Sequence, residues 1–316
     1  MPIATKLNIK PLAPTFAAEV EGVDFSQPVP DDIVHEIQDA AAKYGVLIFR
    51  KTALDDQKLI EFGRKFGELD NCGQHRVHDR PSRIHLDEIF DVSNLNEFNE
   101  IITDNDPVKL AAKNGNATWH ADGAFNPRRT GFSMLRAVEL PPKGTGGETE
   151  YSDSRAAYDD LSNEMKMKIQ GLVGCNSLVH NRKKANPDMA MFKDIDPMDR
   201  PMAKHKIASL HELSGRYSLY ISSYTHHIEG MDIAEGQKLI KELYEHIQKP
   251  KYKFVHHWGE PGDMAMWDNT AVLHRATHGT YGNKYRRDVR RVSVFDTGSA
   301  AYGENEPSTY GNQKAP

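Results

Sequence analysis

Apolar positions recur at helical spacing in the first part of the chain. Within residues 30–45 they return every three or four residues, the first turn is acidic, and Gly45 follows the last turn. This pattern predicts an amphipathic helix that ends at the glycine. Residues 46–50 (VLIFR) are then expected to form a buried strand, and residues 55–67 a second amphipathic helix that ends at Gly67.

From residue 119 onward, short apolar runs between Gly/Pro turns indicate strands. Strands are expected at 132–140, 148–153, 217–222, 251–258, 263–268 and 290–296. Helical spacing returns at 155–171 and at 232–248. Many short strands with a few helices favour a mainly β fold with flanking helices, built as an antiparallel double sheet or barrel.

Two segments lack such a pattern. Residues 70–117 are polar with only short apolar runs, so we expect mostly loop that folds over a site. Residues 299–316 are polar and rich in Gly and Pro, and we expect a loose tail. The preceding residues 1–298 are expected to form one domain, because no repeat or low-complexity linker divides them.

Composition narrows the class of protein. The chain has 316 residues, of which 38% are hydrophobic and 27% charged, with a formal net charge of -5. This charge gives no electrostatic reason to expect nucleic acid or an anionic membrane as a partner. The two cysteines, Cys72 and Cys175, form no CxxC pair, and no apolar run is long enough for a signal peptide or a membrane span. We therefore expect a soluble, cytoplasmic protein.

The first candidate chemistry is a histidine two residues before an aspartate, His120 and Asp122 in TWHADGAF. On a strand both side chains would point to one face, as two metal ligands must. With 15 histidines and 45 acidic residues in the chain, roughly two such pairs are expected by chance. The sequence also contains His85/Asp87 and His227/Glu229. Spacing alone therefore leaves both interpretations of His120 and Asp122 open.

A third ligand could come from GDMAMWDNTAVLHRATHG, where a strand is followed by His274. Two histidines and one carboxylate form the facial triad of non-haem Fe(II) oxygenases, which leaves coordination positions open. Arg287 and Arg291 follow in YRRDVRRVSVFD and could grip the carboxylates of a bound co-substrate. Taken singly, His274 is better explained as a core or surface histidine, and the arginines could form a solvated strand end.

Several long motifs occur together and in order: WHAD, LPPKGTGGETEYSDSRAAYDDL, GDMAMWDNTAVLHR and RRDVRRVSVFD. In this combination the chain resembles the taurine dioxygenase / 2,4-dichlorophenoxyacetate dioxygenase family of Fe(II)- and 2-oxoglutarate-dependent oxygenases. RPSRIHLDEIFDVSN and HHIEGMDIAEGQKLIKELYEH are closer to the 2,4-dichlorophenoxyacetate branch. The resemblance covers most of the chain. It implies a double-stranded β-helix (jelly roll), Fe(II), 2-oxoglutarate and O2, and it is compatible with a homo-oligomer.

The resemblance also implies site residues. The facial triad falls on His120, Asp122 and His274, and the distal carboxylate of 2-oxoglutarate falls on Thr149 and Arg287. His85/Asp87 and His227/Glu229 do not match motif positions.

Three further positions concern substrate and co-substrate. Arg291 matches a position near both the substrate anion and 2-oxoglutarate. Asn116 matches an active-site amide of the taurine enzyme, although a turn residue explains it equally well. Arg76 stands where the 2,4-dichlorophenoxyacetate branch has a substrate-binding lysine, so an anionic substrate is expected but its fine specificity is not readable.

The resemblance implies a reaction class. We expect oxidation of a C–H bond in a small carboxylate-bearing substrate, with succinate and CO2 as co-products. Segments near 70–117 and 180–205 would cover the pocket. Because Asp122 is present, hydroxylation is favoured over halogenation; bond cleavage, desaturation, epoxidation and ring closure stay open. Two other classes also stay open, a zinc-dependent hydrolase and a non-catalytic jelly-roll binding protein, neither of which would need 2-oxoglutarate.

Overall fold

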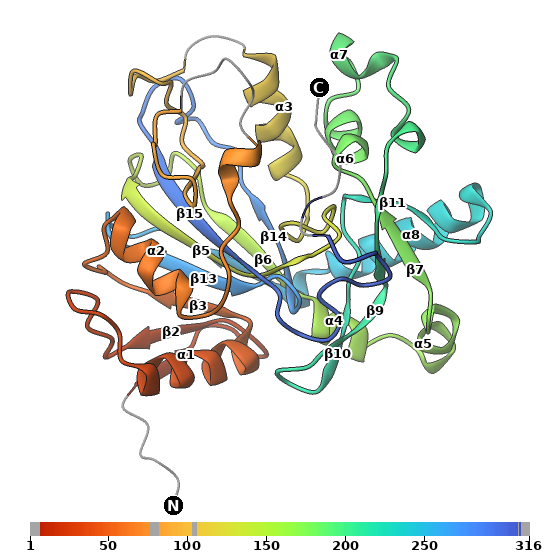
Figure 1. Ribbon diagram of the computed structural model, residues 1–316, viewed down its shortest axis with the longest axis horizontal. Helices are drawn as coiled ribbons and strands as arrows, with labels where there is room; N and C mark the ends of the chain where they lie inside the picture. Colours follow the sequence, from red (N-terminus) through yellow and green to blue (C-terminus); the bar gives the residue numbers. More distant parts are fainter. Residues whose placement is uncertain (1–6, 76–81, 103–105, 309, 311–316) are drawn as a thin grey trace, which may run out of the picture.

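A seven-stranded sheet forms the larger half of the molecule (Figure 1). The computed structural model describes residues 7–75, 82–102, 106–308 and 310. All strand pairs in this sheet are antiparallel except β2 with β3. Its strands, in spatial order, are β1 (Asn8–Pro11), β2 (Ala18–Glu21), β3 (Val46–Phe49), β13 (Met264–Asp268), β5 (Thr130–Glu139), β15 (Asp288–Phe295) and β4 (Phe90–Asp91).

Three smaller antiparallel sheets complete the strands of the described residues. The first has the order β12 (Lys253–His256), β6 (Thr149–Asp153) and β14 (Val272–Ala276). The second is β11 (Thr225–Ile228), β7 (Val173–Asn176) and β8 (Ala203–Lys206), and the third pairs β10 (Arg216–Leu219) with β9 (Ala208–His211). The architecture is therefore mixed α/β with several antiparallel sheets.

Both faces of the large sheet are buried, which explains the near-continuous apolar runs of its central strands. In β5 and β13, Met134 and Met266 point into a core shared with α1 (Asp31–Tyr44) and α2 (Asp56–Arg64). Their neighbours Leu135 and Trp267 point the other way, into a core shared with β6 and β14. Because strand side chains alternate, one strand supplies both cores. The sheet of β6 and β14 thus faces the large sheet.

Helix α8 (Ile233–Ile247) and the helices around it lie on the other side of the molecule (Figure 1). Helix α8 packs with β11 and α4 (Ser154–Asp159) over a separate core, and α3 (Pro107–Asn116) contacts α6 (Leu178–Ala185). The other helical elements are α5 (Asn163–Ile169), α7 (Ala190–Lys193), η1 (Cys72–His75), η2 (Pro197–Asp199) and η3 (Pro250–Tyr252). Within the described ranges, no helix combines the length and apolar character that crossing a bilayer requires.

The sequence prediction was confirmed for α1, α2 and α8 and for strands β3, β5, β6, β10, β12, β13 and β15, with small shifts of their ends. It was wrong at 155–171, where Ser162 caps a new helix by accepting from the amide of Met165 and so divides the segment into α4 and α5. The described residues of segment 70–117 are mostly irregular as expected, but they include α3, η1 and the short strand β4.

The expected loose tail is anchored in its first part. Ala301 is buried and its carbonyl accepts from the amide of Arg129. Asn305 accepts from the amide of Lys204 and donates to its carbonyl. Residues 309 and 311–316 lie outside the described part of the chain.

Candidate metal centre

His120 and His274 meet through their backbones, although 154 residues of sequence separate them. Each amide donates to the other's carbonyl, at 3.0 Å from His120 and 2.8 Å from His274, forming an isolated antiparallel bridge. The two imidazole rings consequently lie with their centroids 4.2 Å apart. The expectation of a strand through His120 and Asp122 was wrong: Asp122 already begins a turn, in which Gly123 has a φ of 64°.

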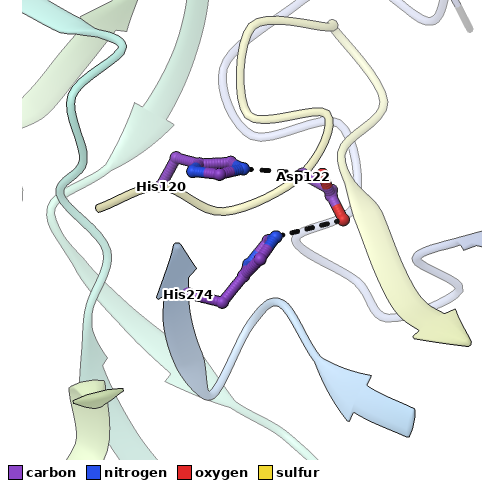
Figure 2. Close-up of side chains that lie close together, drawn as sticks. All are labelled: His120, Asp122 and His274. Atoms are coloured by element: carbon purple, nitrogen blue, oxygen red, sulfur yellow. Dashed lines mark ion pairs between the residues drawn. The ribbon is translucent and has the colours of Figure 1, made fainter. Parts of the chain in front are cut away.

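Asp122 completes a group of three ligand side chains (Figure 2). His120 Nε2 lies 3.9 Å from Asp122 Oδ1, and His274 Nε2 lies 3.6 Å from Asp122 Oδ2. One ligand atom of each residue lies within 4.8 Å of the other two, and all three residues are buried. No other cluster of His, Cys, Asp and Glu in the described ranges meets this criterion. Two imidazole nitrogens and one carboxylate oxygen at these separations fit a divalent first-row metal ion.

The protonation states suit metal binding. His120 Nδ1 lies 2.7 Å from the carbonyl oxygen of Thr118 and donates to it, so Nε2 keeps its lone pair toward Asp122. Burial lowers the pKa of His120 and holds that of His274 well below its usual value. Both imidazoles are therefore neutral, as ligands must be. His274 Nδ1 is buried without a hydrogen-bond partner.

Two polar residues that the sequence did not single out as site residues orient Asp122. Ser133 Oγ donates to Asp122 Oδ2 at 2.8 Å, and Asn269 Oδ1 accepts from the Asp122 amide at 3.0 Å. Asn269 also donates to Ser133 Oγ and accepts from the indole of Trp267, both at 3.0 Å. The signal that could have identified Ser133 is its place between the apolar residues Phe132 and Met134 of a predicted strand, where a buried hydroxyl needs a partner.

Arg291 neutralises the carboxylate. Its Nη1 donates to Asp122 Oδ1 at 2.6 Å, and its guanidinium lies 4.8 Å from the ring centroid of Phe90. Burial alone would raise the pKa of Asp122, but the charge of Arg291, aided by the two histidines and the Ser133 hydroxyl, lowers it to about 2. The carboxylate is therefore ionised at neutral pH.

Arg287 is buried without a carboxylate partner. Its Nη2 donates to the carbonyl oxygen of Gly147 at 3.1 Å and its Nη1 to that of Val92 at 3.4 Å, while Nε has no partner. Burial lowers the pKa of this guanidinium. Thr149 is also buried, two residues after Gly147 on β6, in the sheet that contains His274. The structure thus brings Thr149 and Arg287 to the same region as the three ligands.

The other candidate residues lie in different places. Asn116 is the last residue of α3, and its Oδ1 lies 3.5 Å from both terminal nitrogens of Arg182. Arg76 lies outside the described residues. His85 and His227 do not belong to the ligand group, in agreement with the sequence analysis.

Comparisons with known proteins agree with this geometry. Residues 8–293 match the model of the "Taurine catabolism dioxygenase TauD, TfdA family". The chain is 34% identical over 289 residues to the alpha-ketoglutarate-dependent 2,4-dichlorophenoxyacetate dioxygenase of Burkholderia sp. (strain RASC), covering 92% of this chain and 94% of the relative. It is 29% identical over 276 residues to the (S)-phenoxypropionate/alpha-ketoglutarate dioxygenase of Sphingobium herbicidovorans, covering 85% and 89%. Among solved structures, AAD-2 in complex with Mn(II) and N-oxalylglycine matches with a TM-score of 0.81 and 30% identity, over 93% of this chain and 98% of that one.

Proposed function

The chain belongs to the taurine catabolism dioxygenase TauD, TfdA family, and from this premise we propose that it oxidises a C–H bond of a small, carboxylate-bearing organic substrate. The family is one of 2-oxoglutarate-dependent dioxygenases, oxidoreductases that use Fe(II), 2-oxoglutarate and O2. The oxidation of a C–H bond and the carboxylate-bearing substrate class are the parts that we propose.

His120, Asp122 and His274 are assigned as the three protein ligands of Fe(II). The observation that carries this assignment is the buried group of two imidazoles and one carboxylate, with ligand atoms within 4.8 Å of one another. When bound there with 2-oxoglutarate and O2, iron supplies an oxidant that attacks a C–H bond, with succinate and CO2 as co-products. The chain itself presents neutral imidazoles, holds Asp122 ionised and encloses the ligands in a site that excludes bulk water.

Thr149 and Arg287 are assigned to the distal carboxylate of 2-oxoglutarate. Support comes from the burial of Arg287 among neutral oxygens only, because a buried guanidinium without an anion is unfavourable. A bidentate carboxylate would satisfy the nitrogens that the carbonyls of Gly147 and Val92 leave free. Arg291, which contacts Asp122, is assigned to the region where co-substrate and substrate anion meet.

The substrate is assigned as an organic anion. The similar relatives named above act on 2,4-dichlorophenoxyacetate and (S)-phenoxypropionate, both of which carry a carboxylate. Asn116 and Arg76 are retained as substrate-side residues. Segments 70–117 and 180–205 are assigned as covers of the pocket in a single domain, and the two facing sheets support a double-stranded β-helix.

The test is anaerobic addition of Fe(II) and 2-oxoglutarate to apo-protein, followed by visible absorption. Wild type is expected to show the weak metal-to-ligand charge-transfer band, and His120→Ala to lack it. His85→Ala is the matched control, since His85 also precedes an acidic residue by two positions but lies outside the ligand group. A folded wild type without the band would refute the proposal. Turnover that ignores 2-oxoglutarate would instead indicate a hydrolase.

A further inference from the structure

Arg182 differs from nearly all other arginines of the described ranges because no carboxylate contacts it. Among the arginines of the described ranges whose side chains are mostly enclosed, only Arg182 and Arg287 have no carboxylate partner; Arg128 pairs with Glu68, and the others pair with an aspartate. The arginines paired with an aspartate are Arg83, Arg129, Arg136, Arg155, Arg290 and Arg291. Burial lowers the pKa of Arg182, as it does for Arg287, whereas ion pairs raise the pKa of Arg83, Arg129 and Arg290. Since Arg287 is assigned to 2-oxoglutarate, Arg182 is left as a cation without an anion.

The guanidinium of Arg182 is held in place by neutral oxygens only. Its Nη1 donates to Asn181 Oδ1 at 2.9 Å, and the contacts to the carbonyl of Ala112 and to Asn116 Oδ1 are long, at 3.4 and 3.5 Å. A Cβ added to Gly115 would lie 1.8 Å from Nη1, so only glycine lets the guanidinium reach this position against α3. Arg182 and Asn116 are both partly exposed, so a ligand can contact them.

This guanidinium is connected to the metal centre through two residues. Asn181 donates to Thr118 Oγ1 at 2.9 Å, and the carbonyl of Thr118 accepts from His120 Nδ1. Asn116, four residues before His120, contacts Arg182 directly. The carboxylate of Asp122 does not serve as partner, because Arg291 occupies it.

We propose that Arg182 binds the carboxylate of the primary substrate, on the α3 and α6 side of the metal centre, with Asn116 beside it. The proposal rests on the proposed function and deepens it, since it names the residue that selects an anionic substrate. A substrate carboxylate supplies the charge partner that Arg182 does not have among the contacting residues of the protein. A neutral analogue of the same shape leaves the cation unpaired and binds more weakly.

The other role that the contacts permit is a clamp between α3 and α6. A clamp predicts that removal of Arg182 lowers the melting temperature of the ligand-free protein. An anion-binding residue predicts an unchanged or raised melting temperature, because an unpaired enclosed charge is removed. The two roles therefore differ in a measurement that requires no ligand.

The test compares wild type, Arg182→Gln and Arg182→Lys, with Arg200→Gln as a control at an exposed arginine. The probes are 2,4-dichlorophenoxyacetate and its neutral amide, titrated anaerobically against protein loaded with Fe(II) and 2-oxoglutarate and followed by tryptophan fluorescence. Wild type is expected to bind the acid at least about tenfold more tightly than the amide. Arg182→Gln should raise the Kd of the acid roughly 10- to 100-fold and leave that of the amide unchanged. Arg182→Lys should recover part of the loss.

The outcomes separate this proposal from the one on which it rests. Absence of the charge-transfer band in wild type refutes the proposed function and this proposal with it. A band in wild type and in Arg182→Gln, together with an unchanged Kd for the acid, refutes the role of Arg182 alone. No preference of wild type for acid over amide, or no binding of the acid at all, also refutes it. A lower melting temperature with an unchanged acid-to-amide ratio would assign Arg182 to the clamp.

Discussion

Ser133→Ala tests whether a residue outside the ligand group organises the metal centre. Ser133 is fully buried in β5, between β13 and β15, so its side chain has no freedom to point elsewhere. Its hydroxyl donates to Asp122 Oδ2 and accepts from Asn269 Nδ2. Alanine removes both bonds without adding bulk.

The two hydrogen bonds of Ser133 determine the expected loss of stability in Ser133→Ala. A hydrogen bond to a charged group contributes about 1.5–3 kcal/mol. The second bond adds less, because Asn269 Nδ2 keeps the carbonyl of Gly131 at 3.1 Å. We therefore expect the free energy of unfolding to fall by about 2–3 kcal/mol, which lowers the melting temperature by roughly 3–5 °C in a chain of this size.

The larger effect is expected on metal affinity. Without the hydroxyl, Asp122 Oδ2 is no longer fixed toward His274, and loss of such an outer partner weakens metal binding roughly 10- to 100-fold. Anaerobic titration of Fe(II) against a chromophoric chelator measures the affinity, and thermal unfolding measures the stability.

Ser209→Ala is the matched control. Ser209 is also buried and bonded to a charged side chain, accepting from Arg129 Nη1 at 3.0 Å, but it does not contact Asp122. It should lower stability and leave Fe(II) affinity unchanged. If Ser133→Ala lowers stability by the expected amount but binds Fe(II) as tightly as wild type, the hydroxyl does not orient the ligand and the reasoning is wrong.

Three further predictions concern the fold and the ligands. Gly45→Ala should lower the free energy of unfolding, measured by urea unfolding, more than Gly215→Ala does. Both glycines have a φ of 69°, but only at Gly45 would the added Cβ meet side-chain atoms at 3.0 Å. Equal losses in the two variants would contradict this packing argument. At Gly215 the loss should be about 1–2 kcal/mol, from the left-handed backbone alone. Burial lowers the pKa of His205 to about 4 in the folded protein, whereas in the unfolded chain it is near 6.5. The unfolded chain therefore binds more protons between these values, and the free energy of unfolding should fall by roughly 3 kcal/mol as the pH drops from 6.5 to 4. His205→Gln should flatten the pH profile of the melting temperature, and an unaltered slope would exclude this histidine as a cause. His274→Ala should retain the wild-type circular dichroism spectrum and lose Fe(II) binding, so tight Fe(II) binding by this variant would remove His274 from the ligand set.

The elements that the sequence predicted well are those specified by short-range physics. Helix α1 has an acidic first turn and a glycine at its end, and Gly45 does adopt the left-handed conformation that ends a helix. Helix α8 carries apolar residues at helical spacing, and they form the core beneath it. In each case the signal lies within about 15 residues of sequence, so no knowledge of the rest of the chain is needed.

Elements that depend on distant partners were predicted less well. Strand β14, which carries His274, was not predicted, because its five residues acquire strand character only by pairing with β6. His120 is extended through a single bridge to His274 and not through a strand of its own. The sequence nevertheless named the three residues that the structure groups as candidate ligands, since the resemblance to a family carried information that the local pattern of apolar residues does not contain.

The charges around the candidate metal centre show what the sequence analysis could not predict, namely which arginines meet a carboxylate of the protein. An arginine in a sequence gives no sign of whether a carboxylate will meet it. In the folded chain Arg291 donates a hydrogen bond to the carboxylate of Asp122, whereas Arg182 and Arg287 donate only to neutral oxygens. A metal ion bound by Asp122 would compete with Arg291 for the same carboxylate, so the site would then hold three cationic side chains and a cation with one carboxylate among them. Such a site lacks anions, and two molecules would supply them: the co-substrate and the carboxylate-bearing substrate that we propose. Under the two proposals, Arg182 and Arg287 bind these molecules, which accounts for enclosed guanidinium groups that an ion pair within the fold does not stabilise.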